Sequence, residues 1–255
     1  MKRSELIKYT NKLLNIYDYQ DYGPNGLQIE GNEDISKLAF AVSATKYSID
    51  KAVELGADIL IVHHGLFWKF HGVRTLTKAF YNRVAPLIKN DINLVGYHLP
   101  LDANIEVGNA AALARKLGLT ELKPFGDHKG MPTGVHGVFK TPLSLEDFKN
   151  TLQATLDHKI IHATGDSEKI SSLGIITGGA NSDWVHAQRL GLDAYLTGEI
   201  SEHDWHEASE GGLHFFAGGH NATEQFGIQE LMKNIHEKFG SEGHEYFFIP
   251  SDNPA

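Results

Sequence analysis

The sequence predicts an α/β protein made of two duplicated α/β repeats, in which mixed sheets are flanked by helices. Three observations support this prediction. Short apolar runs alternate along the chain with amphipathic helical patterns, as expected when helices cover sheets. Several helical patterns open with a Ser or Thr cap, and Ser144-Leu-Glu-Asp147 has the character of a capping box. Finally, segments of the first half resemble segments of the second.

The elements follow one another in a regular order. Apolar runs of strand length lie at 37–45, 57–64, 92–99, 134–140, 159–163, 173–178, 194–198, 213–218 and 246–249. Helical patterns lie at 4–17, 48–56, 77–90, 107–117, 144–156, 182–190, 201–210 and 223–239. We therefore expect strand–helix units along most of the chain.

Two pairs of segments indicate the duplication. Leu55-Gly-Ala-Asp58 and Leu190-Gly-Leu-Asp193 each precede a short apolar run. Gly96-Tyr-His98 and Gly218-Gly-His220 each have a carboxylate one helical turn later, at Asp102 and Glu224. The alternative is chance, because Leu-Gly-x-Asp is common at helix–strand junctions. We expect a first repeat over 1–127 and a second over 128–255, with the C-terminal segment packing back on the first.

Composition restricts the class of protein. Hydrophobic residues make up 41% of the chain and charged residues 22%, which indicates a folded globular protein. No apolar run approaches the roughly 18 residues of a membrane span, and the sequence shows no apolar signal segment. The absence of cysteine excludes disulfides, thiolate chemistry and iron–sulfur clusters, and a cytoplasmic location fits best. A net charge of −9 without a basic stripe argues against duplex nucleic acid as the ligand.

Histidine is abundant, at 15 residues, and several histidines follow predicted strands together with carboxylates. His63 and His64 close one strand, His98 follows a second, and His220 follows a third. Ligands gather outside the carboxyl ends of strands in α/β sheets, so these groups could converge. Adjacent residues of a strand point to opposite faces, so His63 and His64 require either a bend or two ions. Imidazole with carboxylate favours Zn, Fe, Mn, Ni or Co over Mg or Ca.

Other readings of these residues carry less weight. A single His near a turn is usually solvated or caps a helix. The Gly-rich pairs at 178–179 and 218–219 lack the Lys-Ser/Thr of a phosphate-binding loop, and no Gly-x-Ser-x-Gly context marks a serine hydrolase. The grouping of several histidines and carboxylates at strand ends therefore favours a metal site.

Six segments resemble the YbgI family (Nif-three-like), whose members are often labelled GTP cyclohydrolase 1 type 2 homologues. These segments span nearly the whole chain, in order, and they are Gly23-Pro-Asn-Gly-Leu-Gln-Ile-Glu-Gly31, Val62-His-His-Gly-Leu-Phe-Trp68, Tyr97-His-Leu-Pro-Leu-Asp102, Gly108-Asn-Ala-Ala-Ala-Leu-Ala114, Thr197-Gly-Glu-Ile-Ser-Glu202 and Gly219-His-Asn-Ala-Thr-Glu224. Two departures are visible, since Asn221 stands where many members have a second His and Ala110 where many have a second Asn. Neither departure removes one of the metal ligands that the resemblance implies.

The resemblance implies a dinuclear metal centre in the cleft between the repeats, and a toroidal homohexamer. Carried over by motif, the metal ligands of two divalent transition-metal ions per chain are His63, His64, Asp102, His220 and Glu224. His98 and Glu199 would line the same cleft, as a proton shuttle or as groups that support the ligands.

Two functions remain open at this point. The first is a metal-dependent hydrolase, cyclohydrolase-like or phosphoesterase-like, that uses a metal-bound hydroxide on a small substrate, with a nucleotide as the candidate. The second is a non-catalytic metal-binding ring protein that acts as a partner-binding or assembly module. No membrane partner is expected in either case.

Overall fold

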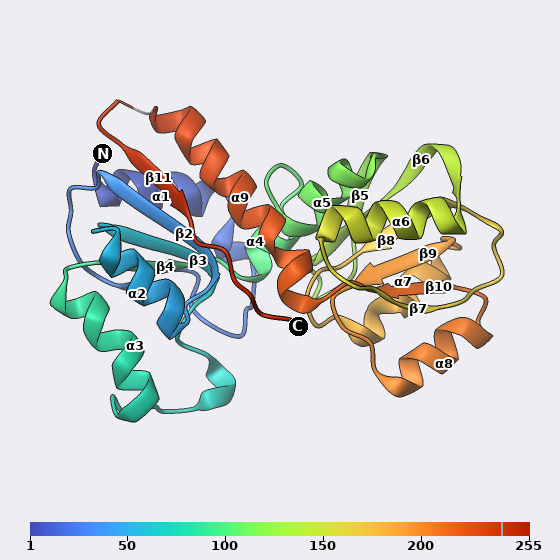
Figure 1. Cartoon of the computed structure of the whole chain (residues 1–255), viewed down its shortest axis with the longest axis horizontal. Helices are drawn as coiled ribbons and strands as arrows, with labels where there is room; N and C mark the ends of the chain where they lie inside the picture. The colour runs from blue at the N-terminus through green and yellow to red at the C-terminus, as the bar shows by residue number, and fades with distance from the viewer. Residues whose placement is uncertain (241) are drawn as a thin grey trace. The chain divides into compact units, whose positions relative to one another are not determined.

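The computed structural model describes residues 1–240 and 242–255, which form two compact units. The first unit contains Met1–Leu101 and Ile228–Asp252, and the second contains Asp102–Gly227 and Asn253–Ala255. The chain therefore enters the second unit at residue 102, and the boundary expected from sequence at 127/128 lies inside that unit. Residues 228–252 return to the first unit, at the red end of the ribbon in Figure 1.

The first unit is built on a five-stranded mixed sheet in the order β1-β4-β3-β2-β11. The strands β4, β3, β2 and β11 are parallel, and β1 is antiparallel to β4. Its elements are α1 (Arg3–Leu13), β1 (Gly26–Ile29), β2 (Lys37–Ser43), α2 (Lys46–Glu54), β3 (Ile59–His64), α3 (Lys78–Lys89), β4 (Asn93–Gly96) and β11 (Glu245–Phe248). Short 3-10 turns occur at Ile16–Asp18 and Lys69–His71.

The second unit is built on a six-stranded mixed sheet in the order β5-β6-β8-β9-β10-β7. The strands β8, β9 and β10 are parallel, whereas β5, β6 and β7 join by antiparallel pairs. Its elements are α5 (Asn109–Leu117), β5 (Leu119–Phe125), β6 (Gly134–Ser144), α6 (Leu145–Leu156), β7 (Ile161–Ala163), β8 (Lys169–Ile175), a 3-10 turn (Asn181–Asp183), α7 (Trp184–Arg189), β9 (Ala194–Thr197), α8 (Glu202–Glu210) and β10 (His214–Ala217).

Two helices belong to both units. The chain passes from the first unit to the second within helix α4 (Leu99–Ala103). It returns to the first unit within helix α9 (His220–Phe239). Both helices begin directly beside a candidate site residue, since His98 precedes α4 and His220 opens α9.

The two sheets repeat the same central pattern. In the first, β2-α2-β3-α3-β4 forms three adjacent parallel strands, and in the second β8-α7-β9-α8-β10 does the same. In each unit an antiparallel strand flanks the last strand of this pattern, β1 beside β4 and β7 beside β10. This correspondence agrees with the predicted duplication of α/β repeats flanked by helices.

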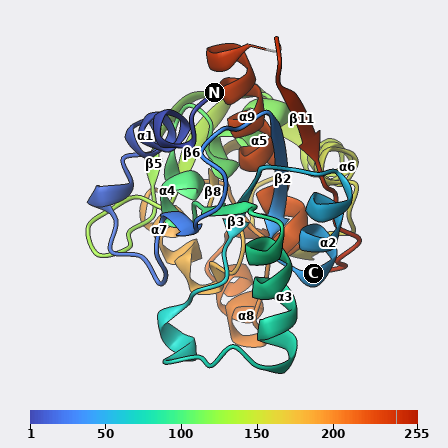
Figure 2. The same ribbon diagram turned by 90° about the vertical axis from the view of Figure 1, so that its left-hand side faces the viewer.

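Helices cover both faces of the second sheet. Phe216 of β10 packs in a cluster with residues of α5 and α6, whereas its neighbour Phe215 packs in another cluster with residues of α7 and α8. Successive strand residues point to opposite faces, so each face of the sheet acquires its own core. In the first unit, apolar residues of β2, β3 and β4 pack with those of α2 and α3. Figures 1 and 2 show these two helices beside the sheet.

The structure contains every predicted strand and helix, with shifts of a few residues at their ends. It also contains β1, β5 and α4, which the apolar pattern did not predict. Strand β1 has only four residues and a register shift, and β5 alternates weakly and contains Pro124. Helix α9 begins at His220 rather than at Thr223. Within the described residues, no helix combines the length and the apolar character that a membrane span requires.

Candidate metal centre

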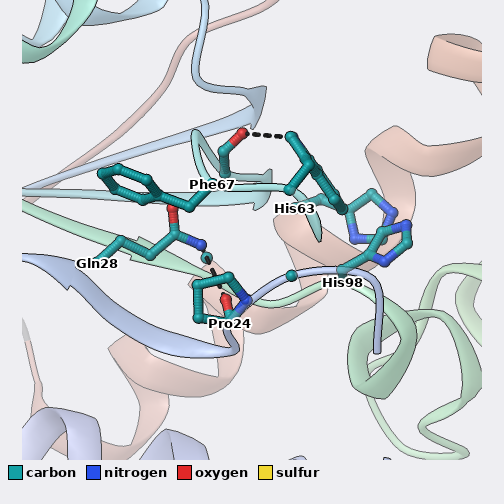
Figure 3. A pocket seen from close by; sticks show the side chains of 9 residues that line it. Pro24, Gln28, His63, Phe67 and His98 are labelled. Atoms are coloured by element: carbon teal, nitrogen blue, oxygen red, sulfur yellow. Dashed lines mark hydrogen bonds between the residues drawn. The ribbon is translucent and has the colours of Figure 1, made fainter. Parts of the chain in front are cut away.

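Three histidines of the first unit gather at the carboxyl ends of two parallel strands. His63 and His64 end β3, and His98 follows β4, the neighbouring strand. One ring nitrogen from each histidine lies within 4.8 Å of those of the other two. The rings of His63 and His98 have centroids 5.1 Å apart and lie together in Figure 3. Because β3 ends here, the adjacent His63 and His64 both reach this place.

Each ring of this trio is anchored through its Nδ1 atom. The His63 Nδ1–H donates to the Tyr97 carbonyl at 2.8 Å, and the His64 Nδ1 lies 2.9 Å from the Ser43 hydroxyl. The His98 Nδ1–H donates to the Asp21 carboxylate at 2.7 Å. Metal-binding histidines are commonly oriented in this way, because a bond at one nitrogen fixes the direction of the other. The arrangement therefore suits coordination through Nε2.

A small pocket adjoins His63 and His98, and Figure 3 shows its lining. The Gln28 carboxamide crosses it, donating to the Pro24 carbonyl and accepting from the Leu66 amide. A Cβ at Gly65 would lie 2.2 Å from the Gln28 Nε2, so only glycine admits this carboxamide. The pocket measures about 10 Å³, which is room for about one water molecule.

The second unit gathers two carboxylates and a histidine. Asp102 lies in α4, and His220 and Glu224 lie one turn apart in α9. The His220 Nε2 lies 3.3 Å from the Glu224 carboxylate. The His220 Nδ1 lies 2.5 Å from the carboxylate of Glu199, which follows β9. A carboxylate oxygen of Asp102 lies within 4.8 Å of one of Glu224.

Both ligand-type carboxylates of the second unit are buried. Asp102 is 5% exposed and Glu224 is 2% exposed. The Asp102 Oδ1 accepts hydrogen bonds from Asn109 at 2.9 Å and from Thr177 at 3.0 Å. Asn109 is itself fixed, because its carbonyl oxygen accepts from the Gly227 amide at 2.7 Å.

Gly178 makes room for the Glu224 carboxylate. Its φ is +72°, and a Cβ at this position would lie 2.1 Å from the Glu224 Oε1. The backbone of Gly178 is held by Thr197, which donates to its carbonyl, and by Thr223, which accepts from its amide. Any other residue here would push the carboxylate away.

Contacts between histidines and carboxylates shift the pKa of His220 and that of Asp21. Burial acts to lower the pKa of His220, but its hydrogen bonds and charge interactions with Glu224 and Glu199 outweigh burial and raise it to about 9. Burial acts to raise the pKa of Asp21, but hydrogen bonds from His98, Asn25 and the Tyr22 amide hold it at about 2. Asp21 is therefore ionised throughout the physiological range.

The residues present fit a transition metal. Two buried carboxylates close together repel each other, and a cation relieves that repulsion. Imidazole nitrogens and carboxylate oxygens are the ligands that Zn, Fe, Mn, Ni and Co accept. Each unit contributes three side chains of this kind, namely His63, His64 and His98 in the first and Asp102, His220 and Glu224 in the second.

Six of the seven site residues expected from sequence lie in these two groups, and the seventh, Glu199, contacts His220. The structure adds supporting residues that sequence reasoning missed. Asp21, Ser43 and Asn109 orient the histidines and carboxylates. Asn109 follows Gly108 in a segment that carries the family resemblance, whereas Asp21 precedes another, Gly23–Gly31, by two positions. Their side chains act through hydrogen bonds to residues distant in sequence, which spacing does not reveal.

The fold and the site define a class, which is a duplicated α/β protein whose histidines and carboxylates could hold a metal ion. The family model of Duf34/NIF3 (NGG1p interacting factor 3) matches residues 1–254, and the chain belongs to this family.

Relatives of this chain that share one name occur in several bacteria. The chain is 40% identical over 258 residues to a protein of Pasteurella multocida and 41% identical over 259 residues to one of Escherichia coli K12, with all of each chain covered. Both relatives are named GTP cyclohydrolase 1 type 2 homolog.

Solved structures show the same fold. One, described as protein ybgI of unknown function, is 39% identical to this chain and superposes with a TM-score of 0.92. The match covers 100% of both chains. A Thermus thermophilus protein is 31% identical with a TM-score of 0.85, and the match covers all of this chain and 99% of that one. These similarities agree with the resemblance read from the sequence motifs.

Proposed function

We propose that the protein binds two divalent transition-metal ions through His63, His64, Asp102, His220 and Glu224. The observation that carries this proposal is the pair of buried carboxylates, Asp102 and Glu224, with oxygens within 4.8 Å of each other. Burial of two like charges close to each other is costly, and bound cations offset it. The imidazoles of His63, His64 and His220 supply the nitrogen ligands.

We further propose that the bound ions serve a metal-dependent hydrolase acting on a small substrate. Such ions, when bound, polarise a substrate oxygen and lower the pKa of a coordinated water. The chain supplies the proton acceptors: His98 carries its proton on Nδ1, bonded to Asp21, so its Nε2 can accept another. Glu199 holds the His220 ring through Nδ1 and so fixes the direction of that side chain.

The names of the relatives make a nucleotide the first substrate to test. The net charge of −9 argues for a small molecule rather than a polynucleotide, because no basic surface would attract a long phosphate backbone. Both a cyclohydrolase and a phosphoesterase would use the same groups.

A second function is favoured by one observation. The pocket beside His63 and His98 holds about one water molecule, too little for a nucleotide base within the first unit. A non-catalytic protein, in which the ions serve assembly or partner binding, would need no larger space.

Metal analysis and turnover assays together test both functions. Protein purified without chelator should contain about two transition-metal ions per chain. GTP, other nucleotides and generic phosphoesters should be assayed in parallel, with Glu224→Gln as the matched inactive control. Metal-dependent turnover of one class supports the hydrolase. A metal-loaded protein with no turnover above that of Glu224→Gln across the pH range supports the binding module, and one ion or none per chain contradicts the dinuclear site.

We also propose a homohexameric ring in the cytoplasm. One stretch of the first unit, residues 70–88, carries several exposed large apolar side chains, namely Phe70, Val73, Leu76, Tyr81 and Ile88. A concentration of exposed apolar surface is typical of subunit contacts, and a second copy of this chain is the proposed occupant. A cysteine-free chain suits the reducing cytoplasm.

A further inference from the structure

We propose that Asp21 is a positioning residue for His98. It holds the His98 ring with the proton on Nδ1 and the lone pair on Nε2, directed at His63 and His64. The purpose of this positioning rests on the proposed metal function. The hydrogen bond between Asp21 and His98 does not depend on a metal. No sequence motif pointed to Asp21.

Both oxygens of the Asp21 carboxylate are fully engaged. The residue is 4% exposed, and its Oδ1 accepts from the Tyr22 amide at 2.6 Å and from the His98 Nδ1–H at 2.7 Å. Its Oδ2 accepts from the Asn25 side chain and from the Leu99 amide, each at 2.9 Å. All four partners are donors, so the carboxylate must be an acceptor at every position. His98 is the only one of the four whose proton could lie on a different atom.

The surrounding contacts keep this carboxylate in place. The Asn25 carbonyl oxygen accepts from the His98 amide at 2.8 Å, so residues 21–25 hold both the ring and the backbone of His98. The Lys69 ammonium donates to the Asp21 backbone carbonyl at 2.6 Å, and the Trp68 ring meets the His98 ring edge to face at 4.9 Å. Rotation of the His98 ring would break the bond to Asp21 and lose the edge-to-face contact with Trp68.

His98 differs from the other two histidines of the trio in the charge of its partner. His63 is anchored on a neutral carbonyl and His64 by a neutral hydroxyl, whereas His98 is anchored on a carboxylate. An anion behind Nδ1 increases the electron density at Nε2 and stabilises positive charge on the ring. Asp21 therefore gives His98 an anionic anchor, which neither of the other two rings has among the bonds described here.

The test compares Asp21→Asn with Asp204→Asn. Asp204 is a matched control because it is also a buried aspartate, 2% exposed, that accepts a hydrogen bond from the side chain of Trp184 at 2.9 Å. The first readout is ¹⁵N NMR of the His98 imidazole in the metal-free protein, assigned with His98→Gln. We expect the Nδ1–H tautomer in the wild type and in Asp204→Asn, and a mixture of tautomers in Asp21→Asn.

The second readout is the affinity for Co²⁺ and Zn²⁺ measured by competition with a chromophoric chelator. His98 supports the ligands rather than being one of them, and disturbing such a supporting group weakens metal binding by about ten- to one-hundredfold. We expect this loss for Asp21→Asn, which releases the His98 ring, and not for Asp204→Asn. Asn25→Ala separates the backbone of His98 from its ring. It removes the bond to the His98 amide and one of the four bonds to the Asp21 carboxylate, but it keeps that carboxylate and its bond to the ring, so the tautomer should persist.

Two results would overturn the proposal. One is an Nε2–H tautomer of His98 in the wild type, a measurement that does not depend on any variant folding. The other is an Asp21→Asn protein with the wild-type tautomer and metal affinities equal to those of Asp204→Asn. If the wild type binds neither metal, the proposed function fails, but the tautomer of His98 still decides the role of Asp21.

Discussion

At the scale of single residues, the site depends on a few positions where no other side chain fits. Gly178 is the clearest, because its positive φ and its closeness to Glu224 both exclude a Cβ. The second unit also offers a control, Gly191, which has a φ of +65° but nothing within 4 Å of the added Cβ.

We predict that Gly178→Ala reduces metal binding and that Gly191→Ala does not. Both substitutions should lower the free energy of unfolding by about 1–3 kcal/mol through backbone strain. Only the first displaces a ligand carboxylate. Metal content after reconstitution and thermal unfolding measure the two effects separately, and equal metal content in both variants would contradict the role of Gly178.

His162 gives a pH dependence at the same scale. Burial, together with the nearby His214 and Lys149, lowers its pKa to about 4 from an ordinary value of 6.5. Above pH 6.5 neither the folded nor the unfolded state is protonated at this residue, so its contribution to pH dependence is nil. Between pH 6.5 and 4 the unfolded state binds a proton at His162 and the folded state does not. The free energy of unfolding therefore falls as the pH falls.

We therefore expect His162→Gln to flatten the loss of stability between pH 6.5 and 4. The amide can still donate to the His214 Nδ1, which lies 3.1 Å from the His162 Nε2. His206→Gln, at an exposed histidine of the same unit, serves as the control. Denaturant unfolding at several pH values checks the prediction, and identical slopes for His162→Gln and the wild type would refute it.

At the scale of elements, helix ends set which side chains meet. Helix α9 begins at His220, so His220 and Glu224 lie on one face one turn apart. Helix α6 begins after Ser144, whose hydroxyl accepts from the Asp147 amide at 3.1 Å, which is the N-cap half of the predicted capping box. The Asp147 carboxylate accepts from the Ser144 hydroxyl at 2.7 Å.

We predict that Ser144→Ala destabilises the protein by about 1 kcal/mol, the usual effect of losing an N-cap. Ser144→Asp should retain most of that stability, because its carboxylate also accepts from the helix amides. Helix α6 contributes none of the candidate ligands, so metal content should stay at the wild-type value. Chemical denaturation and metal analysis of both variants provide the measurement.

At the scale of the whole molecule, each unit has its own apolar core. Fully buried residues such as Leu60 in the first unit and Phe216 in the second form these cores without any metal. We expect Asp102→Asn and Glu224→Gln to lose metal while keeping cooperative thermal unfolding, since ions that bind the folded state add stability by mass action. Unfolding of either variant at room temperature would show instead that the ions are required for the fold.

Assembly gives the second prediction at this scale. Light scattering should report roughly six times 28.2 kDa for the wild type. Val73→Asp places a charge in the proposed subunit contact and should lower this mass, whereas the same change at Val138, exposed in the second unit, should not. A monomeric wild type at micromolar concentration would contradict the ring.

The sequence alone determined the fold class, most of the elements and the candidate ligands. It could do so because strand and helix periodicities are local, and because His63, His64 and His98 follow apolar runs that must end at one edge of a parallel sheet. The same reasoning placed His220 and Glu224 together, since their spacing is a property of any helix.

Tertiary structure decided the rest. The sequence indicated that the C-terminal segment packs back on the first repeat, but not that β11 pairs with β2 in the order β1-β4-β3-β2-β11, because backbone pairing between distant segments leaves no local signal. The role of Asp21 depends on hydrogen bonds to His98 and Leu99 across 77 and 78 residues of chain. The need for glycine at 178 arises from a carboxylate that folding places beside it. Each of these features arises only when separate segments meet, because hydrogen bonds and steric exclusion act at short range in space rather than along the sequence.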